Sequence, residues 1–153
     1  MTEPGRIADQ LRRALRGPAW HGDSLAEILE GVTAAQADNV AIRGAHTIHD
    51  LVLHLTAWAE IALERVTTGE TRDIAAFEDF PAAADWNLDL AKLFDASNRL
   101  AAHIENMSES ELEFVLEPNT QSVYRLLHGV VQHHLYHAGQ MVLLKKAAAE
   151  PSA

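Results

Sequence analysis

The residues with the clearest potential for chemistry are two histidines four positions apart, His133 and His137. They belong to the apolar stripe of a predicted helix over about residues 122–148. Residues at i and i+4 share one helix face, about 5 to 6 Å apart at Cβ, so both imidazoles can reach one ion. A buried imidazole without a partner costs about 1 to 3 kcal/mol, which also favours a shared solution. The other members of the stripe are Leu126, Val130, Met141 and Leu144.

A catalytic zinc ion commonly has three protein ligands and one open position, so a third ligand is needed from another helix. His54 has the best position, because it flanks the core stripe of a preceding predicted helix beside Leu51 and Trp58, whereas His49 falls on the outward side. The alternative is that these histidines only form hydrogen bonds within the core or face solvent. Helical spacing alone leaves both interpretations open.

Four amphipathic segments must position these side chains, and each has recognisable ends. Gly17 and Pro18 stop the first segment, and Ser24 with Glu27 forms a capping box that restarts it. Thr47 caps the next helix and Gly69 ends it, and a long connection with about one helical turn follows over 71–84. With no strand pattern, we predict an all-α four-helix bundle in a single domain, residues 1–153. The predicted helices cover residues 6–16 with a continuation after 24, 47–68, 85–107 and 122–148.

Composition narrows the class of protein. Apolar residues make up 48% of the 153 residues and charged residues 22%, as in soluble globular proteins. The formal net charge of −10 disfavours nucleic acid and anionic membrane as partners. The absence of cysteine excludes a disulfide framework, a thiolate metal site and a cysteine nucleophile. No signal peptide or membrane-spanning run is recognisable, so we expect a cytoplasmic protein.

Several other residues are candidates for a substrate pocket. His21 lies in a predicted turn beside Trp20 and is a weak candidate for a general base, the alternative being a loop histidine with an anchoring aromatic residue. Asp50 is interpreted as a helix cap rather than a support for His54, and Gly139 as a site of close helix approach. His128 is interpreted as structural, and His46, His49, His103 and His134 as surface or packing residues. The predicted pocket consists of Trp20, His21, Trp58, Tyr136 and Gln140.

Two sequence strings resemble a known family. VVQHHLYHAGQM, residues 130–141, is similar to the C-terminal signature of the DinB/YfiT-like metalloenzymes, in which a histidine pair precedes a Gly-Gln step. TIHDLVLHLTAWAE, residues 47–60, resembles the earlier signature, a helix with one histidine followed by a tryptophan. The AWHG turn at 19–22 and Trp86 extend the similarity over essentially the whole chain. The resemblance implies a DinB/YfiT-like four-helix bundle and carries metal-ligand roles onto His54, His133 and His137.

The resemblance also implies a range of activities. Family members include metal-dependent S-transferases that use a low-molecular-weight thiol such as mycothiol or bacillithiol. We therefore expect a divalent metal ion, zinc, nickel or iron, that activates such a thiol for transfer to a small electrophile. The alternatives are a metal-dependent hydrolase that uses metal-bound water, and a non-catalytic, metal-stabilised stress or binding protein. A homodimer acting on a small-molecule substrate is expected from the same resemblance.

Overall fold

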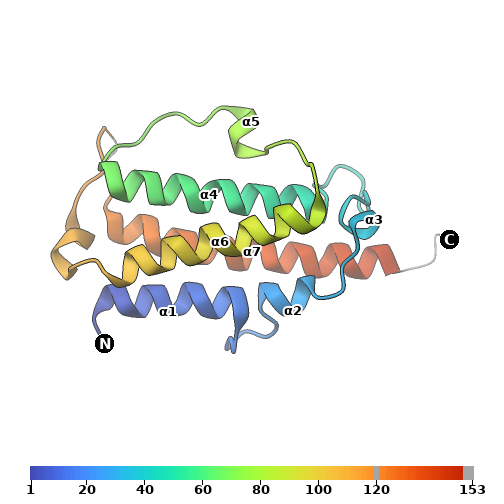
Figure 1. Ribbon diagram of the computed structural model, residues 1–153, viewed down its shortest axis with the longest axis horizontal. Coiled ribbons are helices and arrows are strands. Elements are labelled where there is room, and N and C mark those ends of the chain that lie inside the picture. Colours follow the sequence, from blue (N-terminus) through green and yellow to red (C-terminus); the bar gives the residue numbers. More distant parts are fainter. Residues whose placement is uncertain (119–120, 150–153) are drawn as a thin grey trace.

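Four long helices form the body of the protein in the computed structural model, which describes residues 1–118 and 121–149. They are α1 (Glu3–Arg16), α4 (Ile48–Thr68), α6 (Trp86–Glu105) and α7 (Val123–Ala149). Helices α1 and α4 each pack against both α6 and α7, so they occupy opposite corners of a bundle (Figure 1). The described residues contain no β-strand. The prediction of an all-α four-helix bundle is therefore confirmed.

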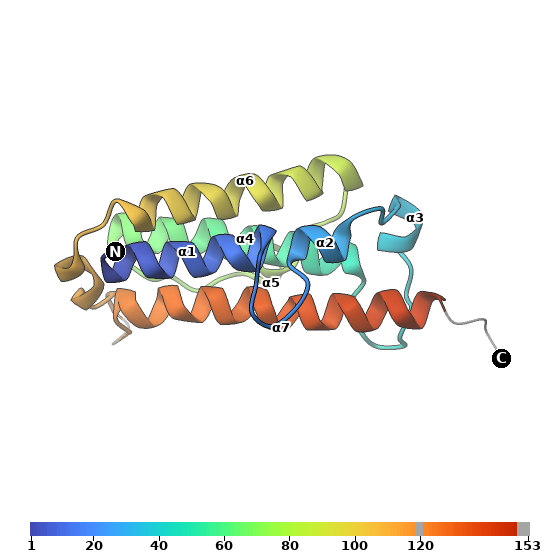
Figure 2. The same cartoon turned by 90° about the horizontal axis from the view of Figure 1, so that it is seen from below.

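The first corner of the bundle is divided between two helices. Helix α1 ends at Gly17, whose φ of 74° suits glycine and whose N–H donates to the Arg13 carbonyl over 2.8 Å. The predicted capping box of Ser24 and Glu27 starts α2 (Leu25–Leu29), which continues the line of α1 and packs on α7 (Figures 1 and 2). A further short helix, α3 (Ala34–Ala37), was not predicted and packs against α4 and α6.

Helix α4 has well-defined ends, as predicted from the sequence. The Thr47 hydroxyl accepts from the Asp50 amide over 3.0 Å, and the Asp50 carboxylate accepts from the Thr47 amide over 2.9 Å. This reciprocal capping confirms the interpretation of Asp50 as a helix cap. Gly69, with a φ of 75°, closes the other end, where its N–H donates to the Arg65 carbonyl.

The connection between α4 and α6 crosses back along the outside of the bundle. It has to, because α4 and α6 run in the same direction (Figure 1). The single predicted turn is present as α5 (Ala76–Asp79), which packs against α4. The connection therefore brings Asp79 and Phe80 onto the face of α4 that carries His54.

The chain returns to α7 through a short 3-10 helix, η1 (Glu109–Glu113), and an isolated bridge between Val115 and Ser122. Helix α7 begins and ends one residue after its predicted bounds. Within residues 1–118 and 121–149, no helix combines the length and apolarity needed to cross a membrane. The core is aliphatic, and its largest fully buried side chains include Ile7, Leu11, Leu15, Leu55, Leu93, Leu100, Ile104 and Leu127.

Two histidines serve the core rather than the surface. His134 is fully buried and donates from Nδ1 to the Val130 carbonyl over 2.9 Å, while its Nε2 lies 3.1 Å from the Ser97 hydroxyl. His134 is thus a packing residue. The prediction that His49 faces outward was wrong, because α3 and the start of α6 cover that side of α4 and leave His49 only 2% exposed.

Candidate metal centre

His54 on α4 and His133 and His137 on α7 meet where these two helices pack together. The Nε2 atom of His133 lies 2.9 Å from Nε2 of His54 and 3.0 Å from Nε2 of His137. These distances are near the roughly 3.3 Å that separates two nitrogens sharing a tetrahedral zinc ion. One nitrogen from each ring can be chosen so that all three lie within 4.8 Å of one another, and the described residues hold no other cluster of three such groups.

The hydrogen bonds of Nδ1 in His54 and His137 determine whether the Nε2 atom of the same ring carries a hydrogen or a lone pair. Nδ1 of His54 lies 2.8 Å from the backbone carbonyl of Asp79, which can only accept, so this Nδ1 carries the hydrogen. Nδ1 of His137 lies 2.6 Å from Oε1 of Gln140, an acceptor as well. In the neutral tautomers, Nε2 of His54 and Nε2 of His137 are therefore lone pairs directed at His133.

Hydrogen bonds within the cluster cannot satisfy all three rings. Nε2 of His133 can carry at most one hydrogen, yet it faces two lone pairs at hydrogen-bond distance. A cation placed among the three nitrogens would satisfy them together, and neutral imidazole nitrogen is a preferred ligand of zinc, nickel and iron. The donor set therefore fits a divalent metal ion.

Burial favours the neutral form of His133 and His137. Desolvation, followed by the neighbouring rings of His137 and His54, lowers the pKa of His133 to about 3. Desolvation also lowers the pKa of His137, against the opposing hydrogen bond to Gln140. Because a metal ligand must be deprotonated, these two rings are ready to bind at neutral pH.

Residues of the connection after α4 contact the His54 ring on the side of Nδ1 and on its face. The Trp58 indole donates to the Asp79 carboxylate over 2.7 Å, which fixes the residue whose carbonyl binds His54. The Phe80 ring stacks on the His54 ring, with 4.3 Å between their centroids. The His46 ring also stacks on Phe80, with 3.9 Å between their centroids. Hydrogen bonding and stacking thus set both the tautomer and the plane of the His54 ring.

Three of the predicted pocket residues lie beside the histidines. Trp58 is 6.0 Å from the His133 ring and Tyr136 is 5.0 Å from the His137 ring, between centroids. Gln140 binds His137 directly. Tyr136 is 65% exposed, so it borders the site from the solvent side.

The structure does not bring Trp20 and His21 to the three histidines. Both line a separate hollow with Val131 and Leu135 of α7. These α7 residues are two positions away from His133 on either side, a rotation of about 200° on a helix, so they face away from it. A general-base role for His21 at this centre stays a prediction without a supporting contact.

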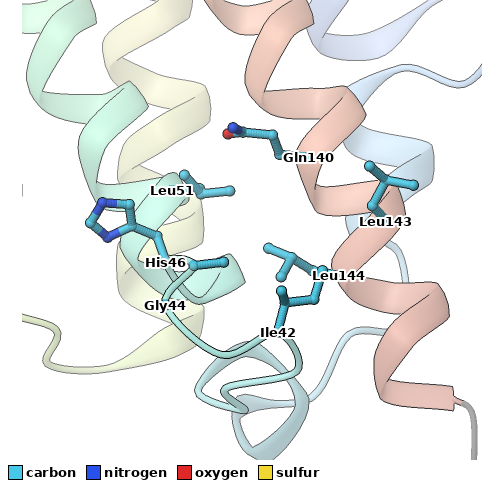
Figure 3. Close-up of a pocket in the computed structure, with 8 residues that line it drawn as sticks. Ile42, Gly44, His46, Leu51, Gln140, Leu143 and Leu144 are labelled. Atoms are coloured by element: carbon cyan, nitrogen blue, oxygen red, sulfur yellow. The ribbon is translucent and has the colours of Figure 1, made fainter.

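Two hollows flank the histidine cluster. One, of about 350 Å³, is lined by His46, Leu51, Gln140 and Leu144 among others, and Figure 3 shows these side chains around it. The other, of about 340 Å³, lies between α4 and α7 and is lined by His133, Trp58 and Arg65 among others. The second hollow reaches His133 directly, and the first lies beside Gln140, which contacts His137.

Sequence reasoning missed several residues of this centre. Asp79 contributes a backbone carbonyl, and Phe80 and His46 contribute stacking, none of which follows a helical spacing. The suggestion that Gly139 allows close helix approach was wrong, since a Cβ placed there meets no atom within 4 Å. The sequence offered one sign of these contacts, namely Phe80, an aromatic residue directly after the acidic residues Glu78 and Asp79.

The chain is similar to a known protein family. The family described as the DinB superfamily matches residues 19–141, a span that includes all three histidines, Asp79 and Gln140. Neither the curated proteins nor the solved structures contain a match to this chain.

Proposed function

The chain belongs to the DinB superfamily, and on this premise we propose that it is a metal-dependent thiol transferase. His54, His133 and His137 bind one divalent ion, zinc, nickel or iron, through their Nε2 atoms. The cosubstrate is a low-molecular-weight thiol of the mycothiol or bacillithiol type, and the acceptor is a small electrophile. The homodimer and the cytoplasmic location expected from the sequence stay predictions.

The observation that carries this proposal is the convergence of the three Nε2 atoms, two of them fixed as lone pairs by acceptors behind the rings. Without a cation, this arrangement places buried acceptors against one another at a cost in stability. The stability of the fold alone does not explain why three imidazole acceptors are placed together. A site that is costly when empty is typical of functional residues.

A bound divalent ion would supply Lewis acidity, which lowers the pKa of a coordinating thiol so that the reactive thiolate forms at neutral pH. The residues around it would position the reactants. Asp79 and Gln140 hold two of the imidazole rings, and Trp58 and Phe80 cover the cluster with aromatic surface. The two flanking hollows offer separate places for thiol and electrophile.

The lack of cysteine in the chain supports an external thiol as the nucleophile. It also makes the proposal simple to test. Any loss of thiol in a reaction mixture comes from the added thiol alone, because the protein has none to contribute.

We expect the metal-loaded protein to accelerate the reaction of mycothiol or bacillithiol with monochlorobimane, and chelation to abolish the acceleration. Full ionisation of a thiol whose pKa is about 8.5 raises its thiolate fraction roughly 30-fold at pH 7, which sets the scale of the effect. Initial rates of bimane fluorescence measure it, before chelation, after chelation and after return of zinc, nickel or iron.

The matched control is His103→Ala, which removes a histidine near the end of α6 that is outside the cluster. This variant should keep the full rate. A rate that is the same before and after metal removal would contradict the proposal. Metal-dependent ester hydrolysis without thiol consumption would instead favour the hydrolase.

Replacing Gln140 by methionine should weaken metal binding about 10- to 100-fold while the helix stays intact. The change removes the acceptor 2.6 Å from Nδ1 of His137, so the ring is no longer held with its Nε2 lone pair facing the centre. Competition with a chromogenic chelator measures the affinity. Gln132→Met, at an exposed position of the same helix, is the control and should bind as the wild type does.

A further inference from the structure

The hollow between α4 and α7 has a cation, the guanidinium of Arg65, in its lining. The hollow is lined by His133 and Trp58, by the apolar side chains of Leu126 and Val130, and by Arg65. Arg65 lies seven residues, or about two helical turns, beyond Trp58 on α4. A molecule that reached the histidine cluster through this hollow would pass the guanidinium.

Arg65 has no partner among the described residues. It forms no ion pair or side-chain hydrogen bond there, and its Nε is buried without any acceptor. Asp73, which lines a wider hollow together with Arg65, is not paired with it. The guanidinium instead lies over the Trp58 ring, 5.4 Å from the ring centroid.

Several other arginines of this acidic protein are paired with carboxylates, whereas Arg16, Arg43 and Arg125, for which the described residues show no ion pair, are exposed. Arg72, the nearest other cation in the sequence, is bound by Glu64 and Glu78, and Arg99 by Asp95 and Glu60. With a formal net charge of −10, carboxylates are plentiful. Within the part of the chain that the structure describes, a partly buried guanidinium that pairs with no carboxylate is therefore an exception that calls for an explanation.

The position of Arg65 in the last turn of α4 explains only in part why an unpaired guanidinium is partly buried. A cation there interacts favourably with the helix dipole, but an extended side chain in solvent would gain the same. Burial and the charge of Arg72 lower the pKa of Arg65, so its surroundings disfavour the charge as they stand. An anion delivered into the hollow would relieve both effects.

We propose that Arg65 binds the carboxylate of a small substrate whose other end lies against His133. A guanidinium donates two parallel hydrogen bonds to a carboxylate, and Arg65 lines the hollow while its guanidinium lies over Trp58. The walls of Leu126 and Val130 suit a short hydrocarbon segment between carboxylate and reacting carbon. A carboxylate carries one negative charge, which this single guanidinium balances.

This assignment deepens the proposed function and rests on it only for the chemical step. Carboxylate binding can be measured without the metal, so the two can fail separately. The probes are benzoate and its neutral analogue benzamide, which are alike in shape and differ in charge.

Benzoate should shift the Arg65 Nε–H and Trp58 indole signals of the ¹⁵N-labelled full-length protein in a saturable way, and benzamide should not. Arg65→Gln should raise the benzoate dissociation constant at least about tenfold, as expected for a charge-assisted hydrogen bond. Arg65→Lys should give a smaller increase, because the charge is kept and the paired geometry lost. Arg99→Gln, the control, should leave the dissociation constant unchanged.

The link to the histidine cluster is tested with iodoacetate and iodoacetamide as electrophiles in the metal-loaded protein. Arg65→Gln should lower the ratio of their kcat/KM values, iodoacetate over iodoacetamide, at least about tenfold. Metal content should not change. Benzoate that leaves both signals unmoved, or that binds Arg65→Gln as tightly as wild type, would overturn the carboxylate site whether or not the metal centre is confirmed.

Discussion

Replacing His133 by leucine is expected to empty the metal centre while leaving the metal-free protein at least as stable as the wild type. His133 is the central member of the cluster, with its Nε2 in contact with Nε2 of both His54 and His137. Removing a residue that only supports a metal ligand costs about 10- to 100-fold in affinity, so loss of a ligand should cost at least about 100-fold. Metal content per chain, by mass spectrometry, measures the result after dialysis.

The stability of the metal-free protein gives an independent readout. Desolvation lowers the pKa of His133 to about 3, which indicates a polar ring in surroundings that do not favour its charge. Leucine removes that ring and the opposed lone pairs, so we expect no fall in Tm. Metal at about 1,000 times its dissociation constant should stabilise the wild type by about 4 kcal/mol, or roughly 8 to 16 °C in Tm, and not the variant.

His103→Ala serves again as the control and should retain both the metal and the shift in Tm. His54→Ala and His137→Ala should lose metal as His133→Leu does. One metal ion per chain that survives all three substitutions would disprove this ligand set. A large fall in the Tm of metal-free His133→Leu would mean instead that the ring serves to stabilise the fold.

The sequence predicted the two histidines of α7 for a simple physical reason. They share one helix, so the i, i+4 spacing alone places both rings on one face, and no tertiary information is needed. His54 lies on another helix, and its pairing with them depends on how α4 and α7 pack. Helical position favoured His54 over His49, but only the resemblance to the family selected it as a ligand.

What the sequence did not reveal lies in groups without a periodic pattern. The acceptor for His54 is the backbone carbonyl of Asp79, and a carbonyl has no residue type to recognise. The Phe80 and His46 stacks require the connection after α4 to fold back along that helix. Arg65 drew no attention because an arginine near a helix C-terminus is ordinary, and its lack of a partner is a tertiary fact.

His49 is the clearest failure, and its surroundings show why. Judged from the stripe of α4 alone, it faced outward, but its Nδ1 lies 2.7 Å from Asp38 at the end of α3 and its Nε2 lies 3.1 Å from Asp89 on α6. Helix α3 was not predicted, so no element was expected to cover this side. The ring joins three helices at the end of the bundle.

Replacing Asp89 by asparagine should lower the free energy of unfolding by about 2 to 4 kcal/mol, the cost of breaking a buried charged group. Asp89 is only 1% exposed, and it accepts from Lys92 over 2.8 Å and from the Ala84 amide over 3.1 Å, besides facing His49. An amide bears no charge and cannot accept at both of its ends. Tm should fall by roughly 10 °C.

The pH dependence of this loss follows from the carboxyl group. Burial by itself raises the pKa of Asp89, but the hydrogen bonds from Lys92, Ala84 and His49 outweigh burial and lower it. A pKa that is lower in the folded state adds stability at pH values above the unfolded pKa of about 3.9, and this stability is lost as the pH falls through the folded pKa. The difference between wild type and Asp89→Asn should therefore persist above about pH 4 and shrink below it.

Urea unfolding of both proteins across this range measures the difference, with Asp95→Asn as the control. Asp95 lies on the same helix and pairs with Arg99, but both side chains are exposed, so its loss should cost less than about 1 kcal/mol. If Asp89→Asn were no more costly than Asp95→Asn, the charges around His49 would not hold α3, α4 and α6 together. A large loss confined to Asp89→Asn would show that this end of the bundle, next to the first turn of α4, depends on a buried ionic contact. The metal centre further along α4 would then rest on a helix that is anchored by charge at its start.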